Sequence, residues 1–385
     1  MGRRVTKKSE PKTKWRMSQI ERDIFHLLIR CGECSANAIN TLPYSRNRIG
    51  IVTRRMIEME WIDEVQVTHR VWRKYKSTGW IRVKASERGF RLNPQAISEE
   101  LVQAYISPSE FEQGYKRTAE IIHRGERRAN RALRQSEVEA IALRLEKEGL
   151  KNFISSSVIK KKQEDDKAEY LTVQSSKAYG VFYNNEKAYP TYNILSNQFE
   201  SFDIKSETRF RVRSKQITDK KIDSRILLCK SLKNFKKLLT GNMYGKEISE
   251  DGEKVNIVKN TIKTTDYRHT LLVSMTQTGI RLLSILLADG GEDFLRQLAP
   301  MNQNGRYTMC DAELKEMNDT VRVFNFLIPD AGHLLEMNVE HETASDNIKY
   351  RVYCFEEYTQ SILETFPYAE VIEVSLDNAY MQMML

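Results

Sequence analysis

Apolar positions near the amino-terminal end of the chain repeat with helical spacing three times. Ser18 opens a capping box, and the apolar run that follows it ends at Gly32. A second, shorter run begins at Ser35 and is stopped by Pro43, and a third is capped by Ser45. Two short helices joined across Pro43 predict a helix-turn-helix.

The third predicted helix continues to about Glu60 and has two unlike faces. Ile49, Val52 and Met56 fall on one face at about 100° per residue. The opposite face is polar and basic, with Asn47, Gly50 and Arg54 along it and Arg46 and Arg48 in the first turn. Arginine can donate two hydrogen bonds to guanine, asparagine can pair with adenine, and glycine allows close approach of the backbone. We interpret this face as a DNA-reading surface, with an ordinary solvated helix face as the alternative interpretation.

Alternating apolar and polar residues then predict a β-hairpin whose turn lies at residues 77–79. Its outer part carries cations suited to phosphate contacts: Arg70, Arg73, Lys74, Lys76, Arg82 and Lys84. The interleaved Trp72, Tyr75 and Trp80 suit the minor groove or, equally, the packing of the hairpin itself. The order of three helices followed by a hairpin resembles the winged-helix family. In this chain the hairpin is expected to close at residues 85–90 in a polar turn that contains glycine. The resemblance implies binding to double-stranded DNA.

The next segment predicts helices rich in arginine. Ser107 opens a second capping box, and Ser136 begins a further helix that ends at Gly149. The arginines between them would form a stripe along one helix side: Arg124, Arg127, Arg128 and Arg131. The stripe either extends the DNA contact or pairs with Glu120 and Glu126.

The carboxy-terminal part changes to short apolar strands, each followed by a helix pattern. Four such units begin at residues 225, 269, 321 and 350, and a hairpin precedes them at residues 180–194. This order predicts an α/β domain with a mixed, largely parallel sheet. Residues 206–217 fit helix and strand equally, and the polar stretches at residues 160–167 and 245–265 predict loops.

The predicted organisation has four parts. A basic arm at residues 1–16 precedes an α+β winged helix-turn-helix domain at residues 17–93. A helical connector at residues 94–150 leads to the α/β domain at residues 151–385. We expect the basic arm to be disordered when free and to add DNA affinity that does not depend on sequence.

Charge strengthens the nucleic-acid interpretation because it is concentrated at one end. Residues 1–91 hold 21 Lys and Arg against 9 Asp and Glu, whereas the remaining residues hold 40 against 43. A concentrated surplus creates a local field that attracts a polyanion. The longest apolar runs are too short to cross a membrane, so we expect a cytoplasmic protein without a membrane partner. Five irregularly spaced cysteines predict reduced thiols.

The chain is also similar, over residues 175–215, to the replication-relaxation proteins of plasmids and conjugative elements. Some relatives in that family hold a restriction-endonuclease-like core, in which a Pro-Asp pair and a Glu-x-Lys bind a divalent metal. This chain has Tyr179-Gly180 and Thr191-Tyr192-Asn193 at those places. The carboxylates for a hard cation are missing, so the resemblance implies a degenerate, catalytically silent core.

Other chemistry is not indicated by the sequence. Phosphate loops, dinucleotide-binding turns and nucleophile elbows are absent. Cys31 and Cys34 have the spacing of zinc ligands, but no second pair of ligands follows, so we predict no metal. Because the other motifs are absent as well, we also predict no cofactor and no catalytic residue. We expect a sequence-specific double-stranded DNA-binding protein of a bacterial mobile genetic element, acting in plasmid replication or conjugative transfer. Its expected partners are DNA, a second copy of the chain, and replication or transfer proteins.

Two alternatives stay open. A metal-dependent nuclease or nickase would use acidic residues of the α/β domain, such as Glu200, Asp203 and Glu207. Nicking of supercoiled DNA with Mg²⁺ or Mn²⁺, lost in Glu207→Ala, would establish it. A ligand-responsive transcriptional regulator would instead show an apolar pocket with convergent polar groups in that domain.

Overall fold

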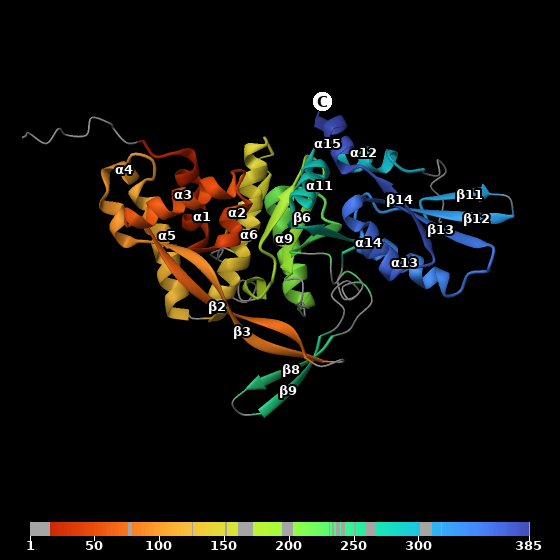
Figure 1. Ribbon diagram of the computed structural model, residues 1–385, viewed down its shortest axis with the longest axis horizontal. Coiled ribbons are helices and arrows are strands. Elements are labelled where there is room, and N and C mark those ends of the chain that lie inside the picture. Colours follow the sequence, from red (N-terminus) through yellow and green to blue (C-terminus); the bar gives the residue numbers. More distant parts are fainter. Residues whose placement is uncertain are drawn as a thin grey trace, which may run out of the picture. The chain divides into compact units, whose positions relative to one another are not determined.

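The computed structural model describes most of the chain (Figure 1). The described ranges are 16–75, 79–124, 126–150, 152–160, 172–194, 203–230, 232, 235, 239, 243–249, 252–258, 267–300, 310–316 and 318–384. Side chains are left out of this description at 68–83, 97, 124–128, 243–258 and 384. The contacts divide the chain into unit 1, Met1–Val67 with Glu87–Ser136, and unit 2, Thr68–Ser86 with Glu137–Leu385. The predicted arm lies outside the described residues except for Arg16.

Unit 1 begins with the three helices that the apolar pattern predicts. They are α1 (Gln19–Cys31), α2 (Ala36–Thr41) and α3 (Arg46–Glu58). Ser18, Ser35 and Ser45 are the N-caps, and Gly32 ends α1 in the left-handed conformation. The three predicted helix starts are therefore confirmed, and α3 ends two residues earlier than expected.

Three strands of a five-stranded sheet come next. The long strands β2 (Ile62–Tyr75) and β3 (Gly79–Leu92) pair with each other, and the short strand β1 (Glu33–Ser35) pairs antiparallel with the end of β3. The expected polar turn at residues 85–90 is wrong, because β3 runs straight through it. Gly89 allows close packing there, since an added Cβ would lie 2.7 Å from Cγ2 of Val67.

Helices complete unit 1. After η1 (Pro94–Ser98) and α4 (Glu100–Gln103) come α5 (Pro108–Arg124) and α6 (Glu126–Lys147). The capping box at Ser107 is confirmed, because its Oγ accepts from the N–H of Glu110 at 3.3 Å. The expected helix start at Ser136 is wrong. The Oγ of Ser136 is buried inside α6, where it donates to the carbonyl of Leu133 at 2.7 Å and accepts from the N–H of Ser35.

Unit 2 is a mixed α/β structure with two mixed sheets, where the sequence predicted one. The first has the order β10-β7-β6-β5-β4 and consists of β4 (Phe153–Ser155), β5 (Gly180–Tyr183), β6 (Ala188–Ile194), β7 (Ser224–Cys229) and β10 (His269–Ser274). The strands β6, β7 and β10 are parallel, and β4 and β5 are antiparallel.

The second sheet has the order β11-β12-β13-β14. It consists of β11 (Ala312–Glu316), β12 (Asp319–Asn325), β13 (Ile348–Phe355) and β14 (Ala369–Val374), of which only β11 is antiparallel to its neighbour. The two sheets share one core, and a backbone bond joins them, from the N–H of Leu272 on β10 to the carbonyl of Pro329 (2.8 Å). The hydroxyl of Tyr358 donates to the carbonyl of Leu272 (2.7 Å).

Helices pack on the two sheets of unit 2. They are α7 (Ser156–Ile159), α9 (Ile204–Thr218), α11 (Gln277–Leu287), α12 (Gly291–Gln297), α13 (Ala331–His341), α14 (Glu356–Thr365) and α15 (Leu376–Met384). The segment at residues 206–217, which fitted helix and strand equally, belongs to α9. The loop expected at residues 245–265 is wrong in its first half, because β8 (Met243–Ser249) and β9 (Gly252–Val258) form a hairpin, and β8 pairs with β3.

Candidate nucleic-acid interface

Helix α3 is held in unit 1 by its apolar face. Ile49, Val52 and Met56 are at most 7% exposed, as the helical spacing predicts. The Oγ of Ser45 caps the helix by accepting from the backbone N–H of Arg48 (3.4 Å). This packing fixes which side of α3 meets solvent.

Two polar contacts with α1 brace α3 and the turn before it. The carboxylate of Glu21 is 1% exposed, accepts from Nε of Arg55 at 2.9 Å and also pairs with the other end of that guanidinium. The same carboxylate accepts from the N–H of Ser18 in the capping box of α1. The hydroxyl of Tyr44 donates to Asp23 at 2.6 Å. Arg55 therefore stabilises the packing of α3 against α1, and it is not part of the outward face.

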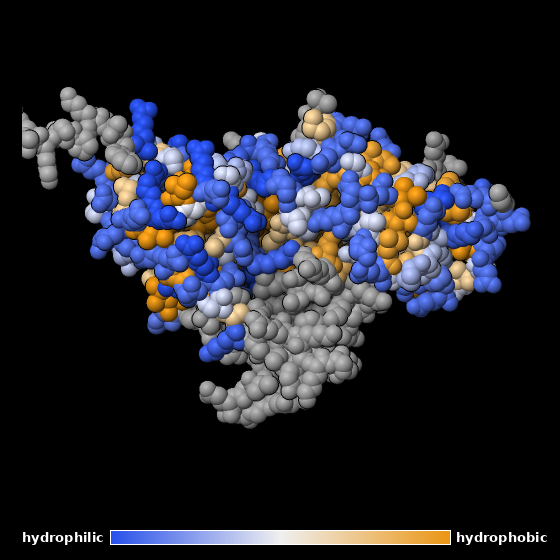
Figure 2. All heavy atoms as spheres, in the orientation of Figure 1, coloured by the Kyte–Doolittle hydropathy of each residue, from blue (hydrophilic) through white to orange (hydrophobic). Residues whose placement is uncertain are grey.

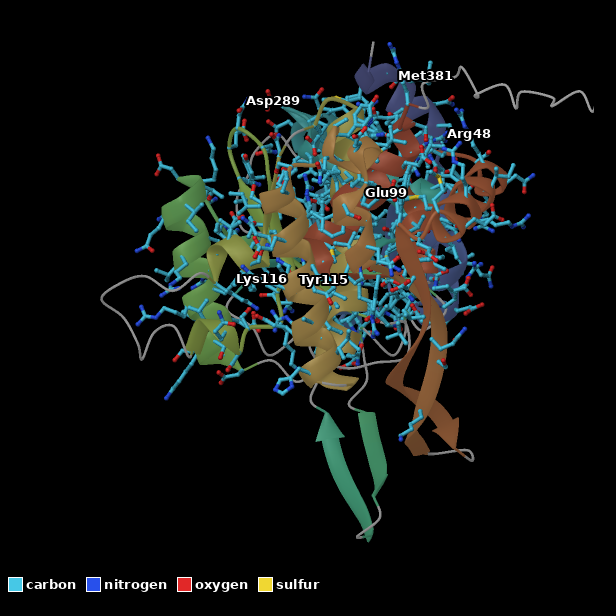
Figure 3. The ribbon with its side chains drawn as sticks, turned by 90° about the vertical axis from the view of Figure 1, so that its left-hand side faces the viewer. Arg48, Glu99, Tyr115, Lys116, Asp289 and Met381 are labelled. Carbon is cyan, nitrogen blue, oxygen red and sulfur yellow. The ribbon has the colours of Figure 1, made fainter. Side chains whose placement is uncertain are left out.

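The outward face of α3 is open to solvent. The five candidate residues of this helix are all exposed: Arg46, Asn47, Arg48, Gly50 and Arg54. Within the described part of the chain, these side chains make no hydrogen bond, ion pair or ring contact. Figure 3 shows Arg48 projecting from the surface, and Figure 2 shows hydrophilic residues over most of the face in view. The structure thus brings these five residues together on one free surface.

The electrostatics of α3 favour an anion at its amino-terminal end. The first turn contains no acidic residue, while Arg46 and Arg48 lie there. Cations at this end oppose the helix dipole, which costs about 0.3–1 kcal/mol each at exposed positions. The first backbone N–H groups of a helix also have no partner within it. Two arginines, free amides and the positive end of the dipole together suit a phosphate group.

The β2–β3 hairpin has a fixed base in unit 1. Val67 is buried against Ile121 and Leu133 of α5 and α6, and Arg91 pairs with the buried Glu33 at 2.7 Å. Arg88 pairs with Glu64 at 2.6 Å. Arg88 and Arg91 therefore hold the base of the hairpin together.

The candidate cations of the hairpin are only partly described. The backbones of Arg70, Arg73, Lys74 and Arg82 lie in strands, while Lys76 and these side chains lie outside the described residues. Lys84 is exposed and has a polar partner. Of the predicted arginine stripe, the side chains of Arg124, Arg127 and Arg128 are not described, and Arg131 has a partner.

In unit 2, a buried carboxylate lies near the carboxyl ends of β6 and β7. The Oε1 of Glu137, on α6, pairs with Nζ of Lys230 at 2.7 Å, and its Oε2 accepts from Nδ2 of Asn193 at 2.8 Å. Each oxygen therefore has a protein partner, and Lys230 supplies the countercharge. These three residues are far apart in the sequence and share no motif spacing, so only the fold brings them together.

The acidic residues of the nuclease alternative are used within the fold. Glu207 is buried and accepts from the hydroxyls of Ser176 (2.8 Å) and Tyr192 (2.7 Å) and from the N–H of Lys177 (2.8 Å). Burial, with Tyr267 and Glu207 nearby, raises the pKa of Tyr192, so its hydroxyl stays a donor. Asp203 caps α9, and Glu200 lies outside the described residues. Among the residues that are described, no three His, Cys, Asp or Glu side chains gather as a metal site.

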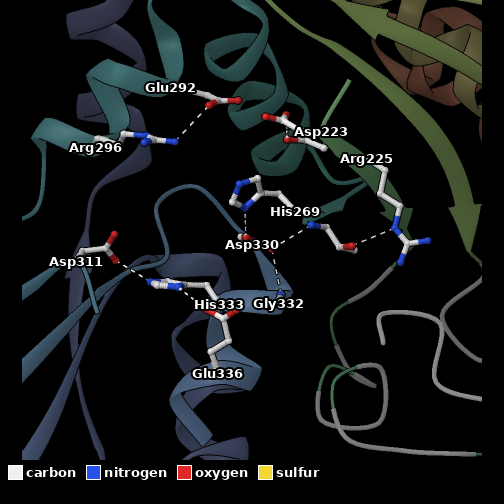
Figure 4. A network of polar contacts seen from close by, with 12 residues as sticks. Asp223, Arg225, His269, Glu292, Arg296, Asp311, Asp330, Gly332, His333 and Glu336 are labelled. Atoms are coloured by element: carbon white, nitrogen blue, oxygen red, sulfur yellow. Dashed lines mark hydrogen bonds and ion pairs between the residues drawn. The ribbon is translucent and has the colours of Figure 1, made fainter. Parts of the chain in front are cut away.

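Two histidine–aspartate pairs lie at the amino-terminal end of α13 (Figure 4). His269 Nδ1 lies 2.6 Å from Asp330 Oδ2, and Asp330 Oδ1 accepts two backbone N–H groups at 3.0 Å. His333 Nε2 lies 2.8 Å from Asp311. Burial alone would lower the pKa of His333, but the bonds to Asp311 and Glu336 outweigh it and raise the pKa to about 10. These pairs connect strands to α13 and are structural.

A pocket of about 180 Å³ lies between the β5–β6 hairpin and α12. Glu292 in its wall accepts from Nζ of Lys187 (2.5 Å) and from the hydroxyl of Tyr189 (2.6 Å). The ligand-sensor alternative called for an apolar pocket, and this pocket is lined by polar and charged side chains. It therefore lends no weight to that alternative.

Comparison with known proteins gives no relatives: no family model, no curated protein and no solved structure matches this chain. None of the helices in the described ranges combines the length and apolar character that crossing a bilayer requires. The five cysteines, all within the described residues, are buried, and no disulfide joins them.

Proposed function

We propose that this chain is a double-stranded DNA-binding protein that reads base sequence with the outward face of α3. The observation that carries the proposal is the contrast within one helix. Arg55 is paired with a buried carboxylate, whereas Arg46, Arg48 and Arg54 are exposed and make no such pair within the described residues. Asparagine and arginine on a free helix face match the hydrogen-bonding edges of bases in the major groove.

The β2–β3 hairpin would serve as the wing of a winged helix-turn-helix domain. Its sequence holds Arg70, Arg73, Lys74, Lys76 and Arg82, which would contact phosphates without reading sequence. The concentration of positive charge in residues 1–91 supports the same assignment.

Unit 2 would serve as a platform that binds a partner protein or a second copy of the chain. The strand order β7-β6-β5-β4, with α9 between β6 and β7, agrees with the degenerate restriction-endonuclease-like core that the family resemblance implies. The carboxylate of Glu137 pairs there with Lys230 and Asn193, so each of its oxygens already has a protein partner. A role in plasmid replication or conjugative transfer rests on that resemblance.

Selection of bound duplexes from a random pool at physiological salt tests the proposal. The full chain should enrich a clear consensus, and the spacing of half-sites would give the symmetry of the bound form. A variant in which Arg46, Arg48 and Arg54 are alanine provides the matched control and should enrich nothing. Failure of the unaltered chain to enrich any sequence would refute the proposal.

A further inference from the structure

The most exposed large apolar side chain in the described part of the chain belongs to α3. Ile51 is 67% exposed, compared with 60% for Ile122 on α5 and 58% for Met381 on α15. It follows Asn47 by four residues and precedes Arg54 by three, so the three side chains are neighbours on one helix face.

Local structure does not account for an isoleucine at this position. The contacts that hold α3 come from Ile49, Val52 and Met56 on the opposite side. Isoleucine is a poorer helix former than the straight-chain residues that usually occupy exposed helix positions. A single exposed apolar residue is ordinary on a protein surface. Here, however, it stands among residues that can donate hydrogen bonds and beside Gly50, where an added Cβ would meet nothing within 4 Å.

The chemistry of the major groove offers one apolar group to such a side chain. The 5-methyl group of thymine is the hydrophobic feature of the base edges, whereas the other features are hydrogen-bond donors and acceptors. Asparagine and arginine can satisfy the polar features on either side of it. A face with one apolar residue between Asn47 and Arg54 therefore matches a thymine flanked by bases that are read through hydrogen bonds.

We propose that Ile51 determines specificity by packing against the 5-methyl group of a thymine in the bound site. This inference rests on the proposed function and adds one base identity to it. The contact removes one methyl group from water, which is worth about 0.8 kcal/mol, or about a fourfold change in affinity.

Replacement of thymine by uracil tests the inference, because it deletes the methyl group and keeps the base pair. In the selected site, uracil at one position should weaken binding of the unaltered chain about fourfold. Ile51→Ala should bind the thymine and uracil duplexes equally. Ile122→Ala removes an isoleucine of similar exposure from another helix of unit 1, so it should keep the fourfold preference.

The outcomes separate this inference from the proposed function. If no consensus is selected, both are wrong. If a consensus is found but uracil is tolerated at every position, or Ile51→Ala keeps the preference for thymine, α3 reads DNA without Ile51 and only this inference is overturned. If Ile51→Ala lowers the affinity for the thymine and uracil duplexes by the same factor, the fourfold preference for thymine remains and the role proposed for Ile51 is wrong.

Discussion

Gly50→Ala should change stability and DNA affinity in opposite directions. Glycine inside a helix costs about 0.5–1 kcal/mol relative to alanine, because it loses more backbone freedom on folding. At Gly50 an added Cβ would meet nothing within 4 Å, so no clash offsets this gain. The variant should therefore be more stable by about that amount, a rise of about 2–8 °C in the melting temperature of a domain of about 60–100 residues.

DNA binding should respond the other way. If the backbone of α3 approaches the nucleic acid closely at Gly50, a methyl group there overpacks the contact and costs about 1–3 kcal/mol. Affinity for the selected site should then fall about 5- to 150-fold. Calorimetric melting and fluorescence anisotropy with a labelled duplex measure the two effects on the same sample.

Gly114→Ala is the matched control. It also lies in a helix of unit 1, but its added Cβ would be 2.8 Å from Cα of Ile29 and 2.8 Å from Cδ1 of Leu92. That variant should lose stability, with the affinity of its folded fraction unchanged. A Gly50→Ala protein that is more stable and binds DNA as tightly as the original would refute close approach of α3 at this residue.

Three further predictions address the face, its support and the second sheet. Arg54→Ala should weaken binding to the selected site more than binding to random DNA, while Lys74→Ala and Lys76→Ala should weaken both alike and flatten the salt dependence. Equal loss on both DNAs for Arg54→Ala would make Arg54 a phosphate contact. Arg55→Ala should lower the free energy of unfolding by about 1–3 kcal/mol, because the buried Glu21 loses its cationic partner. Arg54→Ala should change the free energy of unfolding by less than about 0.5 kcal/mol. Equal changes for the two variants in a denaturant titration would contradict the assignment of Arg55 to the fold. The pKa of His333 is raised to about 10, above its unfolded value, so its stabilising contribution is complete below about pH 6.5 and is lost as the pH rises towards 10. His333→Gln should therefore flatten the dependence of stability on pH between about pH 7 and 10. An unchanged slope in that range would show that the pair of His333 with Asp311 does not cause the pH dependence.

Local signals in the sequence predicted the helices that carry the candidate site. Ser18 with Glu21, Gly32, and Ser45 define helix ends through contacts within a few residues, so each could be identified from sequence alone. The outward orientation of Arg54 followed from helical spacing in the same way. Glu21 illustrates the limit, because its pairing with Arg55 spans 34 residues and depends on how α1 packs against α3.

Other elements depended on tertiary pairing and were missed for that reason. The three residues of β1 are too few for a periodic signal, and they form a strand only because the end of β3 lies beside them. Gly89 resembled a turn residue, although its role is close packing against Val67. The buried group of Glu137, Asn193 and Lys230 likewise required the fold, since no motif spacing connects the three residues.

The link between β10 and Asp330 has a consequence for the motions of unit 2. The amide of Leu272 donates to the carbonyl of Pro329, and that of Thr270 donates to the side chain of Asp330. The first sheet therefore cannot separate from the start of α13 without breaking both hydrogen bonds. Deuterium uptake at β10 should therefore be as slow as uptake at β13, and both should accelerate together when denaturant opens either sheet. The two sheets of unit 2 would then open as one cooperative body rather than one after the other.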